Sequence, residues 1–68
     1  MFDKDKFRGA VASAGSNFAD ISRALGISPA TLYRKTVGKS DFSRNEMEII
    51  RIKLGLTSED VLRIFFAE

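Results

Sequence analysis

The sequence predicts an all-α fold, with one compact domain of five short helices spanning residues 1–68. A glycine that can close a helix in the left-handed conformation follows each of the first four helix-length stretches, at Gly15, Gly26, Gly38 and Gly55. Every stretch begins with a side chain that can accept hydrogen bonds from the free N–H groups of a first helical turn. These five residues are Asp3, Asn17, Ser28, Ser43 and Thr57. No segment shows the sustained alternation of apolar and polar residues that is typical of a strand.

The first two predicted helices run from Asp3 to Gly15 and from Asn17 to Gly26, and both carry apolar residues at helical spacing. We expect their inward faces to consist of Phe7, Ala10, Val11 and Ala14 in the first helix and Phe18, Ile21 and Leu25 in the second. Phe2, just before the first cap, is placed to pack against Phe7 as a hydrophobic staple.

The third predicted helix follows after a very short turn at Gly26, which forces the two helices to cross steeply. Ser28 as cap and Pro29 at the first helical position favour a firm start, because proline's missing N–H is not needed there. The outward residues of this helix include Ala30, Thr31, Tyr33 and Arg34. Their chemistry suits base edges, since Arg can donate two hydrogen bonds to guanine and the Ala and Thr methyl groups can touch the methyl of thymine.

The fourth predicted helix begins with Ser43 and Glu46, which have the spacing of a capping box. Weaker versions of this spacing stand at two other helix starts, Thr57 with Asp60 and Asn17 with Asp20. We expect the fourth helix to turn Met47, Ile50 and Leu54 inward.

The last predicted helix has more apolar residues than one face can hold, namely Val61, Leu62, Ile64, Phe65 and Phe66. One interpretation is that its last turn folds back over a small core. The other is a dimer or partner surface formed by Val61, Ile64, Phe65 and Phe66, with Phe66 and Ile64 as the exposed pair.

Composition argues against several classes of protein. The chain has no Cys and no His, so it offers neither a disulfide framework nor a zinc site of the usual ligands. No apolar run is long enough for a membrane span, and the N-terminal residues lack the apolar stretch of a signal peptide. Gly38-Lys39-Ser40 resembles the end of a phosphate-binding P-loop, but Tyr33 stands where that motif needs glycine. We expect a soluble, cytoplasmic protein that is not an enzyme and needs no cofactor or metal.

The positive charge is concentrated in the middle of the chain. The window from Ile21 to Ser40 contains Arg23, Arg34, Lys35 and Lys39 and no acid, whereas residues 41–68 contain more acids than bases. On charge alone, this asymmetry fits a solvated basic patch about as well as a face that binds a polyanion.

Leu25-Gly-Ile-Ser-Pro-Ala-Thr-Leu-Tyr-Arg-Lys35 and the following Gly38-Lys-Ser-Asp-Phe42 resemble the central motif of short phage regulators. The segment is similar to the helix-turn-helix of phage Cro and repressor proteins. The resemblance implies a lambda-repressor-like domain whose helices 2 and 3 form the motif, with helix 3 in the major groove of double-stranded DNA.

The resemblance also implies roles for individual residues. It makes Ala30, Thr31, Tyr33 and Arg34 the base readers and assigns phosphate contacts to Asn17, Ser28, Lys35, Lys39, Ser40 and Arg44. Lys35 departs from the family, because many repressors place an apolar residue there, so we expect Thr36 or Val37 to fill the gap. Pro29 and Ala30 replace longer polar readers, which leaves more of the specificity to Tyr33 and Arg34.

Two functions from different classes follow. The first is a transcriptional regulator of the phage Cro/repressor type that binds an operator, as a homodimer, in a bacterial or phage-infected cell. The alternative is a protein-interaction module such as an anti-repressor, which would use the C-terminal apolar helix to bind a second phage regulator.

Overall fold

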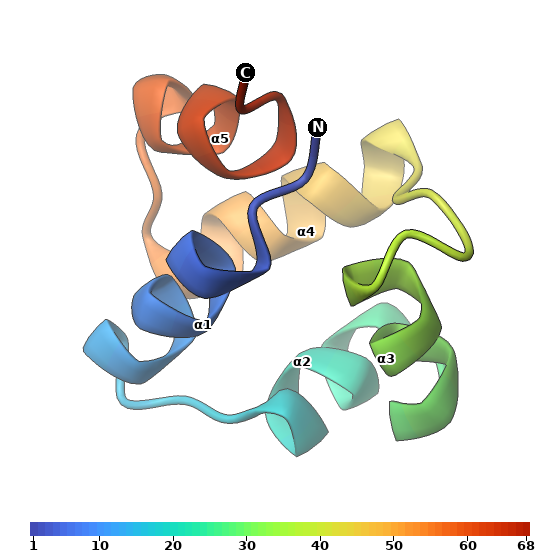
Figure 1. The fold of residues 1–68 in the computed structure, drawn as a ribbon. Helices are drawn as coiled ribbons and strands as arrows, with labels where there is room; N and C mark the ends of the chain where they lie inside the picture. The colour runs from blue at the N-terminus through green and yellow to red at the C-terminus, as the bar shows by residue number, and fades with distance from the viewer.

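Five helices follow one another along the chain in a computed structural model that describes all residues 1–68 (Figure 1). They are α1 (Lys4–Ser13), α2 (Phe18–Leu25), α3 (Pro29–Thr36), α4 (Arg44–Leu54) and α5 (Ser58–Phe65). There are no strands, so the predicted all-α class is confirmed. The radius of gyration is 10.6 Å, close to the value of about 11 Å expected for a compact chain of this length.

All five predicted caps start a helix, and each accepts a hydrogen bond from a first-turn N–H group. The box of Ser43 with Glu46 is reciprocal, as is the box of Thr57 with Asp60. The third box is only half formed, because the Asp20 carboxylate turns to Ser16 and Arg23 instead of the cap backbone. The helix boundaries are therefore set by local hydrogen bonds that the sequence encodes directly.

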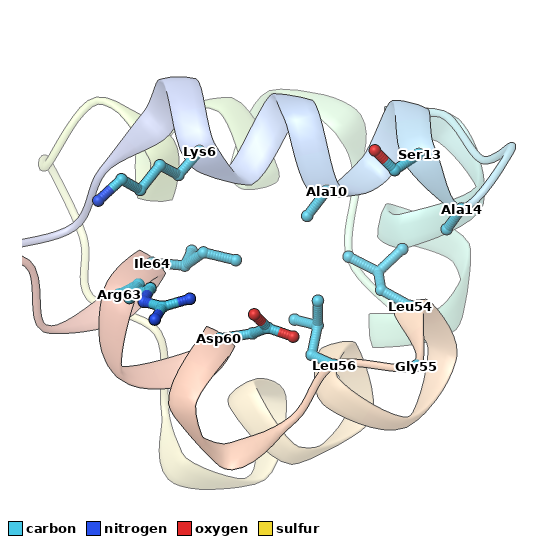
Figure 2. A pocket seen from close by; sticks show the side chains of 10 residues that line it. All are labelled: Lys6, Ala10, Ser13, Ala14, Leu54, Gly55, Leu56, Asp60, Arg63 and Ile64. Carbon is cyan, nitrogen blue, oxygen red and sulfur yellow. The ribbon is translucent and has the colours of Figure 1, made fainter.

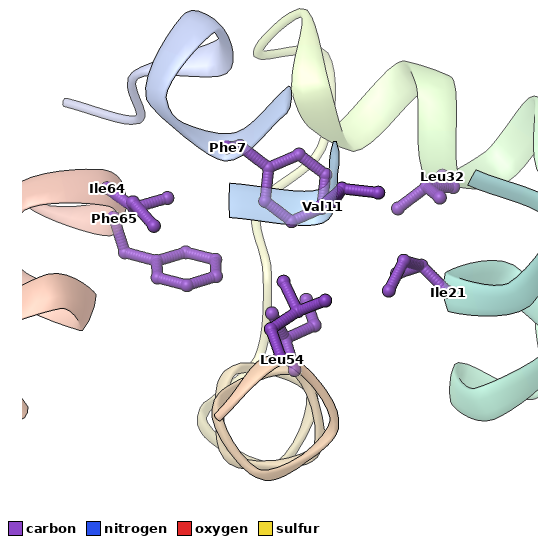
Figure 3. Close-up of a cluster of buried hydrophobic side chains, with 8 residues drawn as sticks. Phe7, Val11, Ile21, Leu32, Leu54, Ile64 and Phe65 are labelled. Atoms are coloured by element: carbon purple, nitrogen blue, oxygen red, sulfur yellow. The ribbon is translucent and has the colours of Figure 1, made fainter. Parts of the chain in front are cut away.

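Every helix contributes to one apolar core (Figure 3). Its eight buried residues are Phe7 and Val11 of α1, Ile21 of α2, Leu32 of α3, Ile50 and Leu54 of α4, and Ile64 and Phe65 of α5. The expectation for Ala14 is wrong, because Ala14 lies just past the end of α1 and is exposed.

Aromatic rings surround the fully buried side chain of Phe7. The Phe7 ring lies 5.4 Å from that of Phe2, 5.5 Å from Phe18, 6.1 Å from Phe42 and 6.5 Å from Phe65. Phe2 and Phe42 each precede a helix cap, so the expected staple of Phe2 with Phe7 has become part of the core. Such ring pairs each add about 0.5–1.5 kcal/mol beyond the area that they bury.

The two ends of the chain lie together, as Figure 1 shows. The backbone N–H of Asp3 donates to the carbonyl of Ile64 at 2.7 Å, and the Met1 amino group donates to the carbonyl of Ala67 at 2.7 Å. These bonds hold the start of α1 against the end of α5. None of the helices has the length and apolar character needed to cross a membrane.

The structure corrects the predicted surface of α5. Ile64 and Phe65 are 4% and 7% exposed and belong to the core, because α5 packs against both α1 and α4, and Val61 is half-buried beside them. The exposed apolar pair is Leu62 at 59% and Phe66 at 55%. The helix folds over the core, as the first interpretation expects, and Leu62 takes the exposed place that the second interpretation gives to Ile64.

We expect Phe7→Ala to lower the free energy of unfolding by about 3–5 kcal/mol, because it removes a fully buried ring at the centre of the core. The matched control is Phe66→Ala at an exposed position, which should change the stability by less than about 1 kcal/mol. Urea titrations followed by far-UV circular dichroism give both values. Equal losses in the two variants would contradict the central role of Phe7.

Candidate nucleic-acid interface

Three residues, Gly26, Ile27 and Ser28, join α2 to α3. Gly26 has a φ of 71°, a left-handed conformation that glycine adopts without the strain of a side chain. The N–H of Ile27 donates to the carbonyl of Ser22 at 3.0 Å, which satisfies a free carbonyl at the end of α2. The Ser28 hydroxyl then accepts from the N–H of Thr31, so α3 starts immediately after the turn.

Close packing of α2 and α3 depends on a small residue within α2. Ser22 is 3% exposed, and its hydroxyl donates to the carbonyl of Ala19 at 2.9 Å, so this buried polar group has a partner. α3 packs against α2, which in turn packs against α4. One side of α3 is therefore left without a neighbouring helix, as its place at the edge of Figure 1 shows.

The two sides of α3 differ sharply. Leu32 is fully buried and Thr36 is 5% exposed, whereas Tyr33 is 55% exposed and Ala30 and Arg34 also lie on the surface. Thr36 fills the gap expected beside Lys35, and its hydroxyl donates to the carbonyl of Tyr33. The outer side of α3 thus presents a methyl group, a phenol and a guanidinium to solvent.

Short hydrogen bonds connect three polar side chains at the start of α3. The hydroxyls of Ser28 and Thr31 are 3.0 Å apart, and the Arg34 guanidinium donates to Thr31 Oγ1 at 3.0 Å. Arg34 has no acidic partner, and this bond uses only one of its five N–H donors. The guanidinium is oriented along the helix and keeps donors for an external acceptor.

Lys35 plays a different part from the one predicted. Its side chain is only 11% exposed, and its ammonium lies 3.2 Å from the Glu46 carboxylate, donates to the carbonyl of Asp41 and sits over the Phe42 ring. We therefore remove Lys35 from the phosphate contacts and assign it to fixing the end of α3 against the start of α4. The sequence does contain a signal for this pair, a lysine at a core-facing position and the acid of a capping box.

The Lys35 ion pair affects the titration of Glu46. Burial by itself would raise the pKa of Glu46, but hydrogen bonds from the Ser43 N–H and from Lys35, together with the charge of Lys35, hold this pKa below its ordinary value of 4.5. The carboxylate form is therefore favoured in the folded protein.

The other predicted phosphate contacts lie on the surface near α2, α3 and the segment after α3. Asn17 and Ser28 are the exposed caps of α2 and α3, Lys39 and Ser40 follow α3, and Arg44 is the first residue of α4.

Neither Lys39 nor Arg44 forms an ion pair, whereas three other arginines of the chain do: Arg23 with Asp20, Arg51 with Glu48 and Arg63 with Glu59. Cations without an acidic partner also occur elsewhere, at Lys4, Lys6, Arg8 and Lys53. Cations without an acidic partner are therefore not specific to the region around α3. The feature that distinguishes this region is the exposed side of α3.

Comparison with known proteins finds no family model, no characterised protein and no solved structure that matches the chain. The chemistry and placement of the residues on and around α3 are therefore the basis for inferring a function.

We expect Glu46→Gln to be less stable than the wild type near pH 6, with the difference narrowing as the pH falls to about 3. A carboxyl group with a lowered folded-state pKa stabilises the fold above its ordinary pKa, and this stabilisation is lost as the pH falls through the folded-state value. Urea titrations at several pH values measure the difference. Lys35→Met removes the same ion pair and should show the same narrowing, whereas a difference independent of pH would contradict the proposed role of Glu46.

Proposed function

We propose that this chain is a helix-turn-helix transcriptional regulator that binds double-stranded DNA sequence-specifically, with α3 in the major groove. The observation that carries the proposal is the open side of α3, where Arg34 has no acidic partner and Ala30 and Tyr33 are exposed beside it. The resemblance of this segment to the motif of phage Cro and repressor proteins supports the same assignment. The protein would act by binding alone, in the cytoplasm of a bacterial or phage-infected cell, without catalysis or a cofactor.

In this proposal the bases are read by four residues of α3, Ala30, Thr31, Tyr33 and Arg34. Arg34 is the main reader, because a guanidinium can donate two hydrogen bonds to guanine O6 and N7. The Ala30 and Thr31 methyl groups would contact thymine, while Tyr33 would reach a base edge or a phosphate. The bond from Arg34 to Thr31 supports this role, because an oriented side chain loses less freedom on binding.

Phosphate contacts would come from Asn17, Ser28, Lys39, Ser40 and Arg44. Asn17 and Ser28 stand at the N-termini of α2 and α3, where N–H groups and the helix dipole favour an anion. Lys39 and Arg44 would add charge without having to leave an acidic partner. These contacts position the protein, and the side chains of α3 specify the sequence.

A homodimer on a two-fold symmetric operator is part of the proposal. Leu62 of α5 and Phe66, the residue that follows the helix, are four residues apart, and together they expose an apolar stripe. Half-sites one turn of DNA apart lie about 34 Å from centre to centre. A domain with extents of 27 × 25 × 20 Å is of a suitable size for two copies to lie side by side over that distance.

The same stripe supports a second candidate, a protein-interaction module such as an anti-repressor. In that case Leu62 and Phe66 would dock on another regulator, and the outer side of α3 would have no ligand. The exposure of two large apolar side chains is the specific observation that favours it.

We expect Arg34→Ala to weaken binding to the selected operator by about 1–3 kcal/mol and to relax the choice of base at one position. The operator is first selected from a random duplex pool, and the affinity is then measured by fluorescence anisotropy at several salt concentrations. Arg63→Ala is the matched control, an exposed arginine on α5 that should leave binding unchanged. If no sequence motif emerges from the pool, the regulator proposal fails.

We expect Leu62→Ser and Phe66→Ser each to shift a dimer towards monomer in sedimentation-velocity experiments, because each places a polar group in an apolar contact. Ile52→Ser is the control, since Ile52 is an equally apolar residue, 65% exposed, on a different helix, α4. A wild-type protein that is monomeric with and without the operator would contradict the homodimer and leave the stripe to a different protein partner.

A further inference from the structure

A cleft of about 430 Å³ opens between α1, the end of α4 and α5 (Figure 2). None of the residues that line it belongs to α2, α3 or the segment between α3 and α4. The cleft is therefore separate from the proposed DNA interface. Its volume falls within the range of about 300–1,000 Å³ that is typical of small-molecule sites.

Small residues on two sides create the cleft. Ala10 of α1 and Ala14, just past the end of α1, face it, and Gly55 contributes no side chain at the end of α4. Leu54 and Ile64, both buried, form the apolar floor. An apolar group of a ligand could therefore contact carbon atoms on three sides of the cleft.

Charged groups of both signs lie at one end of this apolar floor. In Figure 2 the Asp60 carboxylate and the Arg63 guanidinium both turn towards the cleft from α5, whereas the Lys6 side chain extends along α1 and its ammonium points away from Asp60. The N–H of Thr57 donates to Asp60 Oδ2. This bond, together with the Thr57 side chain and the charge of Arg63, lowers the pKa of Asp60, so the carboxylate is ionised at neutral pH.

The Arg63 guanidinium also has N–H donors that are not used within the protein. One NH2 hydrogen bond, at 2.6 Å, joins it to Glu59, and its other N–H donors have no acceptor in the protein. Lys6 has no ion pair. The cleft therefore offers donors for a carboxylate close to an acceptor for an ammonium group.

We propose that this cleft binds a free α-amino acid with an apolar side chain of about the size of leucine. The ligand's carboxylate would bind Arg63, its ammonium would bind the Asp60 carboxylate, and its side chain would lie on the apolar floor. A simple carboxylic acid would meet the charge of Asp60 without compensation, and a simple amine would meet Arg63 in the same way. The inference does not depend on DNA binding.

The test is a titration of the ¹⁵N-labelled protein with L-leucine, followed by amide chemical shifts. We expect saturable changes confined to residues that line the cleft, with a dissociation constant of about 1 mM or below. The analogues 4-methylpentanoate and 3-methylbutylamine lack one charged group each, and each should bind at least about tenfold more weakly. No saturable change with leucine, or equal binding of leucine and both analogues, would overturn the proposal.

Variants establish where the ligand binds. Ala14→Leu fills the cleft from the exposed position just after α1 and should abolish the shifts, whereas Ala12→Leu, two residues earlier and outside the cleft, should preserve them. Arg63→Gln should weaken leucine binding by about tenfold and affect 3-methylbutylamine much less. Thermal unfolding of each variant checks that the fold is intact, and wild-type affinity in both Ala14→Leu and Arg63→Gln would overturn the proposal.

Discussion

The burial of Phe7 is the constraint on which the rest of this structure depends. Its ring contacts aromatic side chains from the segment before α1, from α2, from the segment before α4 and from α5. A chain of 68 residues buries a smaller share of its surface than a larger domain does, and it has no cysteine for a disulfide and no cluster of residues that could hold a metal ion. Phe7 can be excluded from water only when all of these segments are in place. The helices are therefore expected to fold and unfold together, because none has a core of its own.

This shared core determines how α3 is held. Leu32 and Thr36 anchor one side of the helix, and the pair of Lys35 with Glu46 joins its last turn to the first turn of α4. Because the buried side chains and Lys35 attach α3 to the rest of the protein, the side chains on its exposed side contribute little to the stability of the fold. Tyr33 and Arg34 are thus available for a ligand at little cost to the fold. A helix attached in this way can present its side chains to a groove as a rigid unit, which limits the entropy lost on binding.

The sequence predicts the features that depend on residues close together in the chain. It does not predict those that depend on how helices distant in the chain pack together. The helix starts at Ser28 and Ser43 depend on residues within one turn, and the sequence predicts them correctly. The inward side of α5 depends on where α1 and α4 lie, so Ile64 was wrongly expected on the surface. The pair of Lys35 with Glu46 joins two helices across an intervening loop, and helical periodicity indicates the core-facing lysine but not the acid that it meets. The cleft was missed for the same reason, since it forms only where three helices meet.

The cleft and the exposed side of α3 occupy different parts of the molecule, and α5 contributes to the core, the stripe and the cleft. Its buried side holds Ile64 and Phe65, the stripe of Leu62 and Phe66 faces solvent, and Arg63 lies beside the cleft. Successive residues of a helix point in different directions. Because α5 packs mainly against α1 and α4, its other sides can face the solvent and the cleft. Phe66 of the stripe lines a depression that also contains Lys35 and Thr36 of α3, whereas no residue of α3 lines the cleft. Occupation of the cleft would leave the outer side of α3 open, so any effect of an amino acid on DNA binding would have to pass through the shared core or through association at the stripe.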